Sequence, residues 1–249
     1  MIYANINIHL AEEKSVLKTI NWFVFLWWSL LVPRFKLIKL NKQGKFTERD
    51  ACAHSIARSW AQKGLAMNGS SIQVSGVENI PQTGGLLFVA NHQSNFDIPI
   101  LIGFLPRDKG FIAKLELLKV PSFSRWMKYI GCIFIDRNNP RQSLETISEA
   151  AERIKAGHSM VVFPEGTRSA NGTVGQFKAG SLRLAVKSGV PVVPVSISGS
   201  KDIMPKGSSL IKSAIVKVVV SPPLMPHDYV GMDSNQVAEK VRSIIVSNM

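Results

Sequence analysis

The sequence of 249 residues has only two cysteines, Cys52 and Cys132, which lie far apart and outside any Cys-x-x-Cys pair or histidine cluster. Neither a disulfide framework nor a zinc site is expected, and this cysteine usage favours a reducing compartment. The chain also lacks the Gly-x-Ser-x-Gly turn of serine hydrolases and the glycine-rich P-loop that ends in Gly-Lys-Ser/Thr. Internal repeats and low-complexity linkers are absent as well.

Acidic residues are scarce. The 17 aspartates and glutamates stand against 30 lysines and arginines, which gives a net charge of +13 and an isoelectric point near 9.9. Such a chain needs an anionic partner, and nucleic acid, an anionic membrane face and an acidic carrier protein all satisfy this condition.

No uncharged run reaches the roughly 20 residues that a membrane-spanning helix requires. The most apolar stretch, Trp22 to Val32, is shorter and contains three tryptophans. It predicts a helix that lies in the membrane interface with the tryptophans at headgroup depth; a buried core helix and a true span are the alternatives. Glu12-Glu13 ahead of it and the lack of a cleavage site argue against a signal peptide. Six basic residues follow and indicate an anionic membrane surface: Arg34, Lys36, Lys39, Lys42, Lys45 and Arg49.

Residues 1–68 are predicted to form two helices joined by a basic turn, as a membrane tether ahead of a separate catalytic body. The second helix is expected to begin with Thr47 as N-cap, with Asp50 three residues on, and to end at Gly64 or at Asn68-Gly69.

Residues 69–249 alternate short apolar runs with helical segments, which is typical of an α/β domain with a mixed, largely parallel sheet flanked by helices. The expected strands are Leu86–Ala90, Phe111–Ala113, Ile133–Ile135, Met160–Phe163, Val190–Ile197 and Ile215–Val220. The expected helices are Pro140–Ala156 with Asn139 as cap and Gly157 as stop, Phe177–Ser188 closed by Gly189, and Asn235–Ser247.

Four polar residues each follow one of these apolar runs. If the strands are parallel, their carboxyl ends lie on one edge of the sheet, where ligands bind in open α/β folds. We therefore expect four loops to converge there. The residues are His92, Lys114, Arg137 and Glu165.

His92 and Asp97 stand five positions apart in the segment Asn91–Asp97, across a turn from strand to helix. The carboxylate can fold back onto one imidazole nitrogen and leave the other free to accept a proton. With no serine nucleophile in place, this pattern predicts that the substrate brings the hydroxyl and that His92 is its general base. A histidine that caps a helix or is satisfied in the core is the alternative interpretation.

The segment Phe163–Ser169 follows another apolar run. Arg168 offers a planar fork for a phosphate, and Glu165 can orient that fork or accept a bond from a substrate hydroxyl. Because a dianionic phosphate needs more than one cation, Lys114 and Arg137 are expected to join Arg168. The alternative is a surface turn with a solvated ion pair.

Asn91–Asp97 resembles the Asn-His-x-Ser-x-x-Asp block of the glycerolipid acyltransferase family. Three further segments are similar to its second, third and fourth blocks, in the same order: Gly131–Arg137, Phe163–Ser169 and Val190–Val195. The Glu-Gly-Thr-Arg-Ser form of the third block resembles the 1-acyl-glycerol-3-phosphate acyltransferase branch, of bacterial type.

This resemblance implies that His92 and Asp97 form a catalytic dyad and that the Val190–Val195 strand lines the site or an acyl groove. It also implies that the glycerophosphate is bound by Arg137, Glu165, Gly166, Thr167 and Arg168, with Lys114 as a looser match. The implied reaction transfers a fatty acyl group from acyl carrier protein or coenzyme A to the sn-2 hydroxyl of lysophosphatidic acid, without metal or cofactor.

The implied location is the cytoplasmic face of the inner membrane, as a monotopic protein that does not bind nucleic acid. Three alternatives stand beside this prediction. They are an acyltransferase for another lysolipid, a hydrolase that uses the same dyad on water, and a basic protein that binds membrane or nucleic acid without catalysis.

Overall fold

The computed structural model describes residues 2–31, 34–169 and 171–249. Its α-helices are α1 (Ile2–Leu31), α2 (Arg34–Lys42), α3 (Phe46–Met67), α4 (Asp97–Phe104), α5 (Pro121–Tyr129), α6 (Pro140–Lys155), α7 (Ala179–Ser188) and α8 (Ser234–Ser247). Its strands are β1 (Ser71–Ser75), β2 (Leu87–Ala90), β3 (Lys109–Lys114), β4 (Ile133–Ile135), β5 (Ser159–Val162), β6 (Val192–Ser198) and β7 (Ile215–Val220). Short 3-10 turns are η1 (Val77–Asn79), η2 (Leu115–Lys119), η3 (Ser200–Asp202) and η4 (Pro226–Asp228).

The strands form one sheet in the order β1-β7-β6-β2-β5-β3-β4. All neighbours pair in parallel except β6 and β7, which are antiparallel. This confirms the predicted mixed, largely parallel sheet. The four strands β2, β5, β3 and β4 are adjacent and parallel, so the loops that follow them leave from the same edge, as the sequence predicted.

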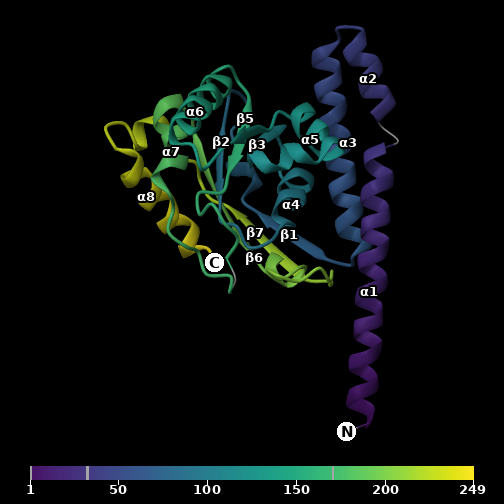
Figure 1. Ribbon diagram of the computed structural model, residues 1–249. Coiled ribbons are helices and arrows are strands. Elements are labelled where there is room, and N and C mark those ends of the chain that lie inside the picture. The colour runs from purple at the N-terminus through teal and green to yellow at the C-terminus, as the bar shows by residue number, and fades with distance from the viewer. Residues whose placement is uncertain (1, 32–33, 170) are drawn as a thin grey trace.

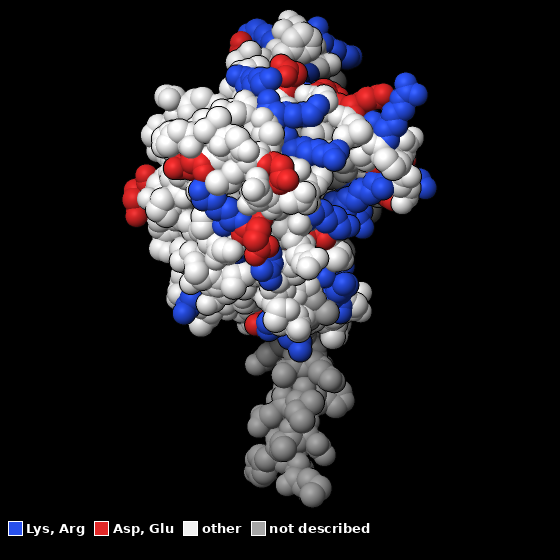
Figure 2. Space-filling model, turned by 90° about the vertical axis from the view of Figure 1, so that its left-hand side faces the viewer, with Lys and Arg blue, Asp and Glu red and all other residues white. Residues whose placement is uncertain are grey.

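Helices cover both faces of the sheet (Figure 1). Along β2, Phe88 and Ala90 join the core under α3, α4 and α5, whereas Leu87 and Val89 join the core under α6, α7 and α8. This alternation follows from the two-residue period of a strand, and the apolar character of both sets is what a doubly covered parallel sheet requires. The outer face of α6, α7 and α8 carries mixed charge, with a band of basic side chains along one margin (Figure 2).

Several predicted boundaries agree with the structure. The Asn139 side chain caps α6 by accepting the N–H of Gln142 at 3.1 Å, and Gly189 ends α7 with a φ of +62°. The prediction missed β1, whose side chains alternate between exposed and half-buried, and the short helix α5.

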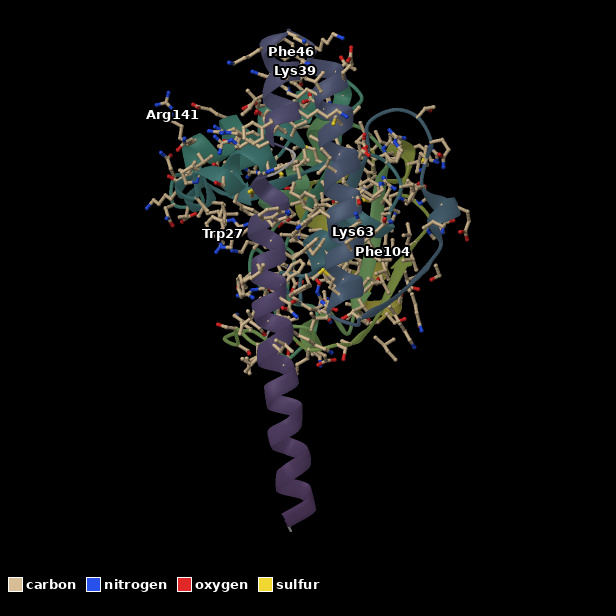
Figure 3. All side chains as sticks on the ribbon, turned by 90° about the vertical axis from the view of Figure 1, so that its right-hand side faces the viewer. Trp27, Lys39, Phe46, Lys63, Phe104 and Arg141 are labelled. Carbon is tan, nitrogen blue, oxygen red and sulfur yellow. The ribbon has the colours of Figure 1, made fainter. Side chains whose placement is uncertain are left out.

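The N-terminal segment differs from the prediction in two respects. The basic stretch forms helix α2, which is anchored by the buried Leu37, and not a turn. Helix α3 begins at Phe46 after Lys45, so Thr47 is not its N-cap. The reason is a tight turn at Gly44 (φ +71°), which reverses the chain between the two helices and leaves no extended residue at position 47. Lys39 and Phe46 lie together at this end of the molecule (Figure 3).

The helical segment shares its core with the sheet. Trp22 of α1 is only 9% exposed and contacts the rings of Phe25, Trp60 and Phe96 at centroid distances of 5.9, 5.8 and 5.3 Å. The expectation of three tryptophans at headgroup depth is therefore wrong for Trp22. For Trp27 and Trp28, which are 60% and 70% exposed, headgroup depth stays a prediction. Trp27 lies on the side of α1 that faces away from α3 (Figure 3).

Gly64 of α3 makes room for the Trp22 indole, because a Cβ on Gly64 would lie 2.1 Å from the ring atom Cζ3. We expect Gly64→Ala to displace Trp22 and to lower the free energy of unfolding by about 1–3 kcal/mol. Gly180→Ala is the matched control, because a Cβ there meets no atom within 4 Å. Thermal unfolding of both variants measures the difference, and equal melting temperatures would contradict this packing.

Candidate active site

His92 and Asp97 form a hydrogen-bonded pair at the carboxyl end of β2. The distance from His92 Nδ1 to Asp97 Oδ2 is 2.7 Å, and the carboxylate is wholly buried while the imidazole retains some exposure. Because an ionised carboxylate can only accept, the proton of this bond is on Nδ1. The second ring nitrogen, Nε2, is then an acceptor for a substrate proton.

Asp97 is fixed by its own backbone turn. Its Oδ2 also accepts the N–H groups of Gln93 at 2.7 Å and Ser94 at 2.9 Å, and Asp97 is the first residue of α4. The short spacing of the motif thus allows one carboxylate to organise the turn and to hold the imidazole.

Helix α4 is also held at its far end. The buried ammonium group of Lys109 donates to the carbonyls of Leu101 at 3.2 Å and Leu105 at 3.1 Å. Burial lowers the pKa of Lys109 to about 7. The helix that carries Asp97 is therefore tied to β3 through its C-terminal carbonyls.

The His92 ring lies against Phe163, which follows β5. The ring centroids are 4.2 Å apart with an angle of 19° between the planes. This stacking restricts the orientation of the imidazole and makes one side of the site apolar.

Glu165 is buried, and both of its oxygens bind backbone N–H groups. Oε1 accepts from His92 at 2.7 Å and Oε2 accepts from Gly175 at 3.0 Å. Within the described residues, Glu165 neither pairs with Arg168 nor lines the cavity beside the dyad. The carboxylate therefore fixes the loop that carries His92. In the described residues Glu165 makes this structural contact in place of the predicted one with Arg168 or a substrate hydroxyl.

A cavity of about 360 Å³ opens beside His92 and reaches between α3 and α5. Most of its lining is apolar, which suits a hydrocarbon chain. Ile56 and Trp60 come from α3, Phe123 and Met127 from α5, and Phe111 from β3.

Cations line the same cavity near the sheet edge. The predicted Lys114, Arg137 and Arg168 are all among the lining residues, as are Gly166 and Thr167. Arg137 donates to the Gly166 carbonyl. Partial desolvation lowers the pKa of Arg137 from its usual value, and the Glu116 carboxylate opposes this shift. A guanidinium that has lost part of its water shell interacts more strongly with an anion.

Cys132 lines the cavity as well, but it is a poor nucleophile. Burial raises the pKa of its thiol to about 12, so the thiolate is almost absent at neutral pH. Cys132 is therefore not expected to form an acyl-enzyme, and His92 beside the cavity is expected to act as a base.

Comparison with known proteins gives the family. A profile of the acyltransferase family matches residues 71–198, which include His92, Asp97, Lys114, Arg137 and Glu165 to Arg168. The chain belongs to the acyltransferase family.

Relatives of this acyltransferase include a probable 1-acyl-sn-glycerol-3-phosphate acyltransferase of Mycoplasma pneumoniae. The two are 36% identical over 71% of this chain and 70% of the relative. The human 1-acyl-sn-glycerol-3-phosphate acyltransferase alpha is 34% identical over 70% of this chain, and the match spans 62% of the human protein. The crystal structure of the 1-acyl-sn-glycerophosphate (LPA) acyltransferase PlsC from Thermotoga maritima superimposes with a TM-score of 0.84 at 29% identity, over 96% of this chain and 95% of the other.

The structure of the acyltransferase adds residues that the sequence did not indicate. Lys206 lines the cavity and donates to the Arg168 carbonyl at 3.0 Å, and Ser200 donates to the second oxygen of Asp97. Both come from the irregular segment after β6, where the sequence has no periodicity. The Val190–Val195 strand was expected to line the site, but β6 is buried within the sheet and contributes no lining residue.

Proposed function

We propose that this acyltransferase moves a fatty acyl group from a thioester donor to the sn-2 hydroxyl of 1-acyl-glycerol-3-phosphate, which yields phosphatidic acid. One observation carries the proposal. A histidine–aspartate pair lies where an apolar cavity meets cations from the end of β3 and from the loops after β4 and β5. The relatives, which are named for this acceptor, support the same reaction.

Each part of the site suits a different part of the proposed substrate. The acceptor's phosphate binds Lys114, Arg137 and Arg168, whose charges offset the desolvation of a dianion. An acyl chain occupies the apolar cavity. The free hydroxyl then lies beside Nε2 of His92.

Catalysis proceeds by direct transfer. His92 Nε2 takes the hydroxyl proton as the oxygen attacks the thioester carbon, and the Nδ1–H bond to Asp97 stabilises the imidazolium that forms. The new carbon–oxygen bond replaces the carbon–sulfur bond, and His92 returns the proton to the departing thiolate.

An acyl-transfer assay tests this function. Purified protein in detergent is incubated with labelled 1-acyl-glycerol-3-phosphate and, in separate reactions, acyl carrier protein thioester or acyl-coenzyme A. Phosphatidic acid is the expected product with at least one donor. Lysophosphatidylcholine replaces the acceptor in a second arm, and a third arm has no acceptor. Equal transfer to lysophosphatidylcholine, or thioester cleavage without acceptor at the same rate, would overturn the proposal.

Arg168→Ala is expected to raise KM for the phosphorylated acceptor about 10-fold or more, with a smaller change in kcat, because it removes a charge-assisted contact made in the ground state. Arg141→Ala is the matched control, because Arg141 is 92% exposed and projects from the body of the molecule (Figure 3). Initial rates over a range of acceptor concentrations give both constants. An unchanged KM in Arg168→Ala would place the phosphate elsewhere.

We further propose that the N-terminal helices bind the cytoplasmic face of an anionic inner membrane without crossing it. The stretch Ser15–Lys42 is long and apolar enough to cross a membrane by length and composition alone. Trp22, however, is buried in the protein core, whereas Trp27, Trp28 and Phe35 are exposed. Exposed apolar side chains next to the basic helix α2 suit the interface between hydrocarbon and anionic headgroups.

Vesicle co-sedimentation tests the membrane proposal. We expect the protein to bind vesicles with phosphatidylglycerol more strongly than vesicles of phosphatidylcholine alone, with a decrease at high salt. Trp27→Ala/Trp28→Ala is expected to weaken binding at least several-fold without lowering the melting temperature, since both side chains are exposed. Equal binding to both vesicle types would contradict the role of α2.

A further inference from the structure

The carboxylate of Asp97 is buried without exposure to water, so its charge depends on the protein groups that donate to it. Three donors reach Oδ2: His92 Nδ1 and the backbone N–H groups of Gln93 and Ser94. All of them belong to the same short turn. The other oxygen, Oδ1, accepts the hydroxyl of Ser200, which is 103 positions away in the sequence and fully buried. It is the single donor to Oδ1 among the described residues.

Ser200 reaches Asp97 because side chains of the motif turn bind the end of β6 and the residue that follows it. The amide of Asn91 bonds both backbone groups of Ile197, with distances of 2.9 Å to the carbonyl and 2.8 Å from the N–H. The Gln93 side chain accepts the N–H of Gly199 at 3.1 Å. Gly199 has a φ of +88°, and a Cβ there would lie 2.4 Å from the Ile215 carbonyl oxygen. Glycine therefore allows the sharp turn that directs Ser200 back to the dyad.

We propose that Ser200 is a positioning residue of the acyl-transfer site, which holds the plane of the Asp97 carboxylate in the orientation that His92 requires. Through Asp97 the hydroxyl extends the dyad into a Ser200–Asp97–His92 relay of hydrogen bonds. The Ser200 hydroxyl donates a hydrogen bond to Oδ1, is fully buried and does not line the cavity, so it is not placed to act as a nucleophile.

The Ser200 hydroxyl restricts rotation of the Asp97 carboxylate, which the donors to Oδ2 alone leave less constrained. Oδ2 carries three bonds at one end of the carboxylate, and Ser200 holds the opposite end. Without it, Oδ1 has no donor in the described structure, and the carboxylate can turn away from Nδ1. The imidazolium of the transition state then loses part of its stabilisation, whereas the cavity and the cations that bind substrate are unchanged.

Ser200→Ala tests the inference, which rests on the proposed function for its kinetic readout. We expect kcat to fall about 10- to 100-fold, which is the effect of losing a hydrogen bond to a charged group, with KM for the acceptor within about 2-fold of wild type. Ser196→Ala is the matched control, since Ser196 is equally buried in β6 but donates to the Ile245 carbonyl at 2.9 Å, away from the dyad. Ser200→Thr retains the hydroxyl and is expected to recover most of kcat.

A double-mutant cycle separates positioning from a general loss of structure. In the Asp97→Asn background, Ser200→Ala is expected to cause less than a 3-fold further loss, because its effect passes through the carboxylate. A full 10- to 100-fold loss in that background would overturn the inference. So would a kcat for Ser200→Ala equal to that of Ser196→Ala. Melting temperatures of all variants show whether each is folded.

A readout independent of turnover keeps the two proposals distinguishable. The ¹⁵N NMR signals of His92, assigned by their absence in His92→Gln, report which ring nitrogen carries the proton. In Ser200→Ala we expect a smaller fraction of the Nδ1-protonated tautomer than in wild type and in Ser196→Ala. An unchanged tautomer ratio would overturn the role of Ser200. If wild type does not acylate lysophosphatidic acid and the ratio still shifts, only the proposed acceptor is wrong.

Discussion

His92→Ala is expected to lower turnover by about 10²–10⁴-fold, which is the range of a general base, while lysophosphatidic acid still binds. The physical reason is that base and phosphate site lie on different loops. His92 follows β2, whereas Lys114 is the last residue of β3, and Arg137 and Arg168 follow β4 and β5. Removal of the imidazole therefore leaves the cations in place.

Kinetics and binding measure this separation together. Single-turnover rates give the loss in chemistry, and isothermal titration in detergent gives the affinity for the acceptor. His227→Ala is the control for loss of a histidine, because His227 is largely exposed beside Asp228 and far along the chain from the motifs. Turnover that survives in purified His92→Ala would refute the assignment of the base. A lost affinity would mean that the imidazole itself binds the acceptor.

Glu165→Ala is expected to be the most damaging change among the remaining motif residues. Its carboxylate accepts the N–H groups of the half-buried His92 and the exposed Gly175, which lie in two different loops. A donor left unpaired away from water costs about 1–3 kcal/mol, so we expect a loss of about 1–3 kcal/mol in the free energy of unfolding, mainly from the N–H of His92, because the exposed Gly175 can bind water. Turnover should fall as well, since the backbone of His92 loses its anchor.

A structural role and a substrate-binding role of Glu165 predict different effects on the melting temperature and on KM. If Glu165 instead contacts the acceptor, as the sequence indicated, the melting temperature should stay unchanged and KM should rise. Glu165→Gln is expected to be intermediate, because an amide offers only one oxygen to the two N–H groups. Glu149→Ala on the exposed face of α6 is the control for loss of a glutamate, since its pair with Arg153 is at the surface.

These predictions divide the polar motif residues into two groups. His92 and the cations face the cavity, whereas the side chains of Asn91, Gln93 and Glu165 bind backbone groups of other segments. Buried polar side chains of this kind are costly unless every group is paired. Their exact partners therefore depend on how the loops are arranged, and a change at one of them displaces a neighbouring loop.

The sequence predicted the sheet well because its central strands are buried on both faces. Such strands are continuous apolar runs, and four of them are recognisable between Leu86 and Phe163. It failed for β1 and α2 for the opposite reason. The edge strand β1 has no fully buried side chain, and α2 buries only Leu37 among exposed basic residues. Segments with so little buried surface have little hydrophobic pattern to detect.

The sequence by itself determined features that depend on neighbouring residues or on a repeated apolar pattern along the chain. It indicated which strands precede the motifs and that His92 pairs with Asp97, because five residues across one turn leave the two side chains within reach. The tertiary structure alone decided which distant groups complete the site. Glu165 meets His92 across 73 positions and Ser200 meets Asp97 across 103, and both contacts exist only because β5 and β6 lie on either side of β2. Hydrogen bonds between loops depend on strand adjacency, which the spacing of residues along a chain does not encode.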